Sequence, residues 1–253
     1  MRKIIVTGKG GVGKTTTVAT LALMMAREGR RVIVFDTDPS MNLAMSFGIP
    51  YGNMSTITED KAEIFHGLEE DGMDELGEEI INNHSALTEE GIRVVVMGPL
   101  QHGGDGCLCS AVSMVKALVD FVEKDGGYDM VIVDSQAGPE VLGRGLASSF
   151  DINIILSEPT VKSFEVSRQV NRLGKDLGIR ETVLVVNKID NESDSALAAG
   201  KIGVDLAMTI GVPYDRCVVN ADKEGKILLD AYPESVALGR LREIKGLIEK
   251  TIW

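Results

Sequence analysis

A glycine-rich loop near the start of the chain carries the residues best suited to phosphate chemistry. The run from Gly8 to Thr15 fits the pattern GxxxxGK[ST]. In such a loop the glycines let backbone N–H groups close on phosphate oxygens, while the lysine and the hydroxyl serve phosphate and Mg²⁺. The pattern therefore predicts a site for a nucleoside triphosphate with Mg²⁺. The residues expected to contact the nucleotide are Gly8, Lys9, Gly10, Gly11, Val12, Gly13, Lys14, Thr15 and Thr16.

A second feature with chemical potential is the cysteine pair Cys107 and Cys109, in a segment rich in glycine. Residues two apart in an extended segment point the same way, so two thiolates can bind one soft metal ion such as Zn²⁺ or Ni²⁺. A helix expected to begin at Ser110 would favour thiolate over thiol. Because two sulfurs do not complete a metal shell, either His102 or the cysteine pair of a second chain is needed as well.

The alternation of apolar and helical segments predicts an α/β protein with a mostly parallel central sheet and helices on both faces. Acidic residues stand where such sheets bind ligands, at the ends of apolar runs: Asp36, Asp38 and Asp134. Because no linker or repeat divides the chain, we expect a single domain over residues 1–253. The expected strands are 4–6, 31–36, 92–97, 128–134, 152–156 and 182–187, and the expected helices are 16–27, 41–47, 110–124, 161–177 and 234–250.

The negative charge of the chain is concentrated in one segment. The net charge is −12, and residues 59–90 contain twelve acidic residues and one lysine. Recurring apolar residues predict one or two acidic amphipathic helices there, presenting either a solvated face or a docking surface for a basic partner. His66 and His84 in this segment are expected on the surface. The charge argues against unspecific binding to nucleic acid.

Composition also bears on the compartment. Three cysteines fit a reducing cytoplasm, no apolar run is long enough to span a bilayer, and no secretory signal is visible. The tail 238–253 has apolar residues at helical spacing, which favours a last helix packed on the core over a membrane contact. We therefore expect a cytoplasmic protein with no transmembrane segment. Cys217 is expected to be a packed thiol.

Lys9 gives the glycine-rich loop a more specific character. The run from Lys9 to Thr15 resembles the deviant Walker A motif of the MinD/ParA/nitrogenase-iron-protein superfamily. The resemblance implies a nucleotide-sandwich homodimer in which Lys9 reaches the partner's phosphates and acts in catalysis with Lys14 and Asp38. It also implies that Asp38 orients the attacking water. The remaining implied roles are Asp36 near the Mg²⁺ ion with Thr15, Asp134 holding Mg²⁺ through water, and Gly138 sensing the γ-phosphate.

Two later segments of the chain are expected to bind the base of the nucleotide. Residues 187–190 read Asn-Lys-Ile-Asp and match the NKxD motif of GTPases, in which an aspartate, here Asp190, pairs with guanine. In the MinD-type superfamily the same strand end supplies an asparagine, here Asn187, to adenine. Pro213 and Asp215 lie in a segment that resembles the loop packing against that base. The deviant Walker A loop favours ATP, which we take as the predicted nucleotide.

The order of P-loop, switches and Cys-x-Cys pair resembles the CooC family. Its members are ATPases that assist nickel insertion into carbon monoxide dehydrogenase, together with related maturation factors of acetyl-CoA synthase. The resemblance covers about residues 8–215 and implies a homodimer that binds one metal ion through four cysteines. ATP binding would favour the closed dimer, and hydrolysis would reopen it.

Three other classes are weighed as alternatives. A reductase similar to the nitrogenase iron protein would need a second cluster cysteine after Asp134, and residues 134–149 contain none. A positioning ATPase of the MinD/ParA type would need a basic tail or face. A nickel-delivering GTPase of the hydrogenase or urease type is supported by Asp190 and opposed by Lys9.

Overall fold

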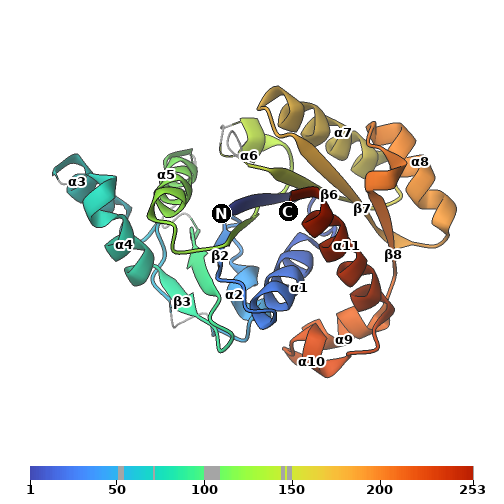
Figure 1. The fold of residues 1–253 in the computed structure, drawn as a ribbon, viewed down its shortest axis with the longest axis horizontal. Helices are drawn as coiled ribbons and strands as arrows, with labels where there is room; N and C mark the ends of the chain where they lie inside the picture. Colours follow the sequence, from blue (N-terminus) through green and yellow to red (C-terminus); the bar gives the residue numbers. More distant parts are fainter. Residues whose placement is uncertain (51–53, 71, 100–108, 144–145, 147–149, 253) are drawn as a thin grey trace.

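The protein forms one central sheet covered by helices on both faces (Figure 1). The computed structural model describes residues 1–50, 54–70, 72–99, 109–143, 146 and 150–252. Eight strands lie in the order β3-β4-β2-β5-β1-β6-β7-β8, and all neighbours are parallel except β3 and β4. The strands are β1 (Arg2–Gly8), β2 (Val32–Asp36), β3 (Ser85–Leu87), β4 (Arg93–Val96), β5 (Met130–Asp134), β6 (Ile152–Ser157), β7 (Glu181–Ile189) and β8 (Thr209–Pro213).

The helices divide between two hydrophobic cores, one on each face of the sheet. Ile4 and Val6 of β1 belong to one core, and Ile5 between them belongs to the other. The first core is covered by α1 (Lys14–Arg27), α2 (Asn42–Ser46), α9 (Arg216–Glu224), α10 (Leu228–Ala231) and α11 (Val236–Ile252). The second is covered by α3 (Lys61–Glu70), α4 (Met73–Asn83), α5 (Cys109–Asp125), α6 (Glu140–Gly143), α7 (Val161–Asp176) and α8 (Glu192–Ile202). The predicted fold class is therefore confirmed.

The central strands are covered by helices on both faces, so their sequences are apolar runs almost without polar residues. The five residues of β2 and of β5 are all buried, and both strands begin within two residues of their predicted starts.

The acidic segment forms two helices, α3 and α4. Two of the described strands, β3 and β8, and four of the described α-helices, α6, α8, α9 and α10, were missed. For α8 a local signal was present, because Asn191 and Asp194 form a capping box at its start.

The placement of His84 differs from the prediction. His66 is exposed, but His84 is buried, with Nδ1 2.8 Å from the carbonyl oxygen of Ile80 and Nε2 3.0 Å from Oδ2 of Asp60. The Ser55 hydroxyl and His84 lower the pKa of Asp60 by hydrogen bonding. Through these two contacts His84 ties the end of α4 to Asp60, the residue just before α3.

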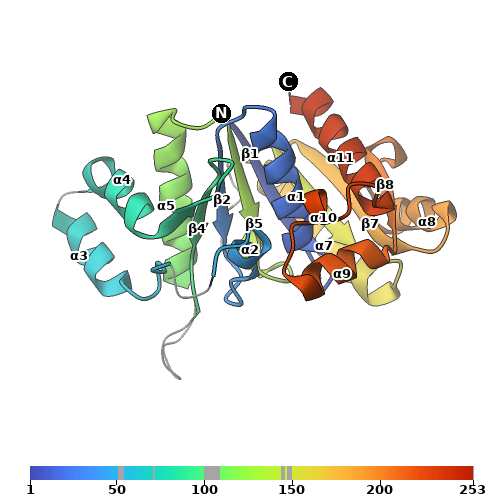
Figure 2. The ribbon, with the colours of Figure 1, turned by 90° about the horizontal axis from the view of Figure 1, so that it is seen from below.

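The last helix packs on the core, as expected. Leu238, Leu241, Ile244 and Ile248 of α11 are buried in the first core, where α11 contacts α1 and β8. None of the helices in the described part of the chain is long and apolar enough to cross a membrane. Figure 2 shows the two chain ends at one end of the sheet and α2 and α9 at the opposite end, where the strands finish.

Candidate functional site

The P-loop connects β1 to α1 and lies so close to its neighbours that two of its glycines cannot carry a side chain. A Cβ on Gly8 would meet the carbonyl oxygen of Leu156 at 2.3 Å. A Cβ on Gly13, whose φ is +98°, would meet Nδ2 of Asn187 at 2.7 Å. The glycines of the motif thus serve close backbone approach as well as turning of the chain.

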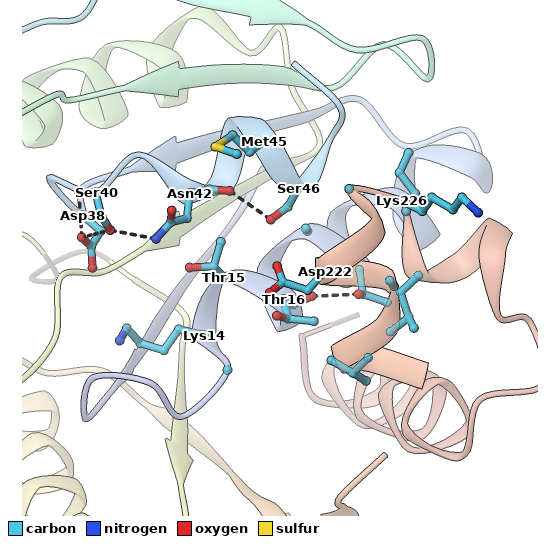
Figure 3. Close-up of a pocket in the computed structure, with 18 of the residues that line it drawn as sticks. Lys14, Thr15, Thr16, Asp38, Ser40, Asn42, Met45, Ser46, Asp222 and Lys226 are labelled. Atoms are coloured by element: carbon cyan, nitrogen blue, oxygen red, sulfur yellow. Dashed lines mark hydrogen bonds between the residues drawn. The ribbon is translucent and has the colours of Figure 1, made fainter. Parts of the chain in front are cut away.

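A pocket of about 570 Å³ opens in front of this loop. Lys14 and Thr15 line it from the P-loop, Asp38 lines it from the segment after β2, and Asp222 and Lys226 line it from α9 and the turn after it (Figure 3). The last two residues were not predicted. No local pattern marks them, because only the fold brings α9 opposite α1.

The two lysines of the motif occupy different environments. Lys14 is buried, and its Nζ donates to the carbonyl oxygen of Lys9 over 3.3 Å. Burial lowers the pKa of the Lys14 ammonium group, and the charges of Asp134 and Asp38 oppose that shift. The Lys9 side chain is half-buried, and no described residue forms a hydrogen bond or ion pair with its ammonium group. The Lys14 ammonium group thus lies within reach of the charges of Asp134 and Asp38, whereas that of Lys9 has no hydrogen-bond or ion-pair partner among the described residues.

Asp36 and Asp134 form a buried acidic pair at the ends of neighbouring strands. They are direct partners in the register of β2 and β5, and their exposed fractions are 1% and 0%. Burial raises the pKa of both carboxyl groups, and the charge of Asp134 raises that of Asp36 further. The Thr15 hydroxyl donates to Oδ2 of Asp134 over 2.6 Å, whereas Oδ1 of Asp134 has no hydrogen-bond partner.

This arrangement fits a hard divalent cation. Carboxylate and hydroxyl oxygens are the ligands that Mg²⁺ prefers, and a buried charge without a partner is costly. A bound cation would take up the orphaned Oδ1 of Asp134 and offset the repulsion within the acidic pair. The residues predicted to serve Mg²⁺ are thus brought together, and their role as ligands stays a prediction.

The acidic pair leads to a prediction about stability and pH. Both folded pKa values lie above the unfolded value of about 4, so the folded chain binds protons that the unfolded chain releases. The free energy of unfolding of the metal-free chain should therefore fall as the pH rises from about 4 to about 8. We expect Asp134→Asn to flatten this dependence and to stabilise the metal-free chain at pH 8 by on the order of 2 kcal/mol.

Thermal unfolding with a chelator present measures this effect. Asp176→Asn, a substitution at the exposed last residue of α7, is the matched control and should leave the pH dependence unchanged. The interpretation is wrong if Asp134→Asn and Asp176→Asn give the same unfolding temperatures between pH 5 and pH 8.

The two predicted switch residues, Asp38 and Gly138, contact different segments of the site. Asp38 donates its backbone N–H to Oδ1 of Asp36 over 3.0 Å, and its own Oδ1 accepts from the Ser40 hydroxyl at 2.6 Å (Figure 3). Gly138 donates its backbone N–H to the carbonyl oxygen of Gly8 over 3.0 Å. The Gly138 N–H would have to leave Gly8 before it could serve a bound nucleotide, whereas the Asp38 carboxylate can accept a further hydrogen bond.

The predicted base-binding residues surround a smaller cavity of about 190 Å³ beside the P-loop. Asn187 and Pro213 line it, and Nδ2 of Asn187 donates to the carbonyl oxygen of Val12 over 2.8 Å. Asp215 also lines it, but its Oδ2 accepts from the Ser235 hydroxyl at 2.6 Å and its Oδ1 accepts from the backbone of Cys217. The Asp215 carboxylate thus joins the starts of α9 and α11, a structural role that the sequence did not predict.

The predicted metal ligands are only partly described. Cys107 and His102 lie outside the described residues. Cys109 is the first residue of α5, so its backbone is helical and not extended, because the helix begins one residue earlier than predicted. Of the described residues, no three His, Cys, Asp or Glu side chains gather into a group that could hold a metal ion. Cys217 is a half-buried free thiol packed against the first core, as expected.

Comparison with known proteins adds independent information. Residues 3–229 match the family model described as the CobQ/CobB/MinD/ParA nucleotide binding domain. The carbon monoxide dehydrogenase accessory protein CooC of Rhodospirillum rubrum is 32% identical over 91% of this chain and 90% of its own length. An uncharacterized ATP-binding protein of Methanocaldococcus jannaschii is 33% identical over 88% and 90% of the two chains.

The structural comparison supports the same fold. The septum site-determining protein MinD of Pyrococcus horikoshii, solved in complex with Mg-ADP, superposes with a TM-score of 0.76. Its sequence is 20% identical, and the match covers 98% of this chain and 96% of that one. At this identity the likeness establishes the fold only. The similarity to CooC, by contrast, confirms the resemblance drawn from the motifs.

Proposed function

Because the chain belongs to the CobQ/CobB/MinD/ParA nucleotide-binding family, we propose that it is an ATP-hydrolysing maturation factor for a nickel enzyme. The observation that carries the ATPase part is that Lys14 and Thr15 line the pocket while Thr15 bonds to the buried Asp134, whose register partner is Asp36. The similarity to CooC over nine-tenths of both chains supports the maturation part. The proposed client is carbon monoxide dehydrogenase or acetyl-CoA synthase.

The residues at the P-loop divide the work of phosphoryl transfer. Lys14 and the loop N–H groups hold the phosphates, and Asp38 orients the water that attacks the γ-phosphate. Thr15, Asp36 and Asp134 would hold Mg²⁺, which when bound supplies positive charge to the phosphate oxygens. Proton transfer from the attacking water is aided by the carboxylate of Asp38, which is half-buried at the rim of the pocket.

Completion of the site by a second copy would give the Lys9 ammonium group a partner, which it lacks among the described residues. An additional cation at the transferring phosphoryl group stabilises charge that develops in the transition state. No described residue of its own chain pairs with the Lys9 ammonium group. We therefore propose a homodimer in which each Lys9 serves the nucleotide of the partner. The contact between the Gly138 amide and Gly8 would open when a γ-phosphate competes for that amide.

Nickel insertion is tested directly with the metal-free client. The client is incubated with this chain, Ni²⁺ and ATP, and the nickel bound to the re-isolated client is measured. We expect ATP to raise the yield, and Lys14→Ala to remove the ATP effect. Equal yields with and without ATP would contradict the maturation role, while an intact ATPase rate would leave the enzymatic part standing.

The choice of base is a separate prediction. We expect Asn187 to read adenine, and Asp190 is exposed, with its backbone N–H bound to Oδ2 of Asp194. Competition between ATP and GTP with Mg²⁺ present should show preference for ATP, unchanged in Asp190→Ala. Tighter binding of GTP that disappears in Asp190→Ala would move the chain toward the nickel-delivering GTPases.

The metal carried to the client is proposed to bind at Cys107 and Cys109. Thiolates suit both Ni²⁺ and Zn²⁺, and a second chain would supply the other two sulfurs of the shell. Four sulfurs from two chains match the two-fold symmetry that the Lys9 argument requires. The proposal rests on the sequence and on the likeness to CooC.

A further inference from the structure

Lys188 has a backbone conformation that few residues adopt. Its φ is +59°, and of the non-glycine residues that the structure describes only Met41 shares a positive φ. For a residue with a Cβ this conformation costs about 1–2 kcal/mol. It coincides with an irregularity between Asn187 and Ile189 in the pairing of β7 with β8. Such a strained conformation persists only where surrounding contacts stabilise it, so the contacts of Lys188 indicate which function the conformation serves.

The side chain of Lys188 joins three segments of the chain. Its Nζ donates to the carbonyl oxygen of Gly11 in the P-loop over 3.1 Å and to Oε1 of Glu158 over 2.6 Å. Glu158 directly follows β6, and its backbone N–H donates to the Ser163 hydroxyl over 2.9 Å. Lys188 is therefore fastened to the start of α7 on one side and to the P-loop on the other.

The neighbouring residue, Asn187, forms a hydrogen bond to the next carbonyl group of the same loop. Asn187 donates to the carbonyl oxygen of Val12, while Lys188 donates to that of Gly11. In a trans peptide the carbonyl and the following N–H point in opposite directions. Holding both carbonyls on the β7 side therefore turns the amides of Val12 and Gly13 away from β7. That is the orientation in which loop amides can meet phosphate oxygens.

We infer that Lys188, braced by Glu158, is a positioning residue that holds the P-loop in the conformation that receives the nucleotide phosphates. The inference rests on the proposed binding of ATP. It also gives the Asn-Lys-Ile-Asp run a use other than reading guanine. In that run the lysine serves the loop, while the aspartate is exposed at the start of α8.

The expected effect is a loss of nucleotide affinity. Lys188→Met removes the ammonium group, and we expect the dissociation constant for Mg-ATP to rise roughly tenfold, as for loss of a charged hydrogen bond that is partly exposed. Mg-ADP should lose the same factor, because the loop amides serve phosphates common to both nucleotides. Lys188→Arg keeps a cation that can reach both acceptors and should restore most of the affinity.

Two further variants separate the tether from the backbone strain and from fold stability. Lys188→Asn places a residue that tolerates the left-handed conformation, so it spares the backbone while removing the ammonium group. It should bind nucleotide as weakly as Lys188→Met without a lower unfolding temperature. Glu158→Gln should weaken binding less, and combining it with Lys188→Met should add little, because both changes act on one contact.

The experiment measures dissociation constants for Mg-ATP and Mg-ADP by calorimetry, with the unfolding temperature of each nucleotide-free variant. Lys162→Met is the matched control, since it removes the charge of an exposed lysine in the first turn of α7. Weaker binding in Lys188→Met and Lys188→Asn, rescued by arginine and absent in the control, supports the inference. Unchanged affinity in both, with a lowered unfolding temperature or without one, overturns it. If the unsubstituted chain binds no nucleotide, the proposed function itself fails.

Discussion

A Lys9→Ala protein is expected to bind ATP with near-normal affinity and to lose almost all of its hydrolysis. The ammonium group of Lys9 has no described partner within its own chain, so its removal should leave the folded subunit and its phosphate contacts intact. In the proposed dimer the same group stabilises charge on the partner's transferring phosphoryl group, a contribution of about 10³-fold or more for comparable cationic fingers. Phosphate release at saturating ATP, with ATP affinity measured alongside, checks both halves.

Two further variants at the same site should fail in different ways from Lys9→Ala. Lys14→Ala should lose nucleotide binding altogether, because the buried Lys14 ammonium group lies in the phosphate pocket itself. Asp38→Ala should retain ATP and accumulate as a dimer, since it removes the group that orients water and leaves the phosphate contacts. Normal turnover in Lys9→Ala would remove the case for a sandwich dimer. Hydrolysis at the normal rate in Asp38→Ala would refute the role given to that residue.

The parts of this site that could be predicted are those specified by neighbours in the chain. The P-loop is recognisable because its glycines, lysine and threonine act within eight consecutive positions. The acids at 36 and 134 could be placed together because each ends a fully apolar run, and parallel strands bring such ends to one edge of the sheet. Apolar runs and helical periodicity therefore located most of the described strands and helices to within a few residues.

The parts that were missed depend on partners far away in the sequence. The buried His84 meets an acid 24 positions earlier, and Asp215, which caps α9 locally, also meets a serine 20 positions later. Lys188 acts on a P-loop carbonyl 177 positions away, so its pattern alone suggested a base-reading motif. In each case the side chain is polar, and the folded structure determines which distant residue it contacts. The pattern of apolar residues in the sequence does not reveal such contacts.

The second large effect is expected at the cysteine pair. Purified dimer should bind about one Zn²⁺ or Ni²⁺ per two chains, because four thiolates complete a shell that two cannot. Binding should release protons and weaken as the pH falls, since the ligand is the thiolate. Metal should also promote dimerisation without nucleotide. If closure serves both ligands, linkage requires ATP and metal to change each other's affinity by one common factor.

Serine substitutions test this model against its rivals. Cys107→Ser and Cys109→Ser should each abolish metal binding and leave ATP binding intact, whereas Cys217→Ser, at the half-buried free thiol, is the matched control and should change neither. One metal per single chain, lost in His102→Ala, would replace the bridging site by a local one. Because Cys109 begins α5, its metal-bound form must also be compatible with a helical first turn. Undiminished metal affinity in the double serine variant would leave a nucleotide-driven switch with no metal cargo.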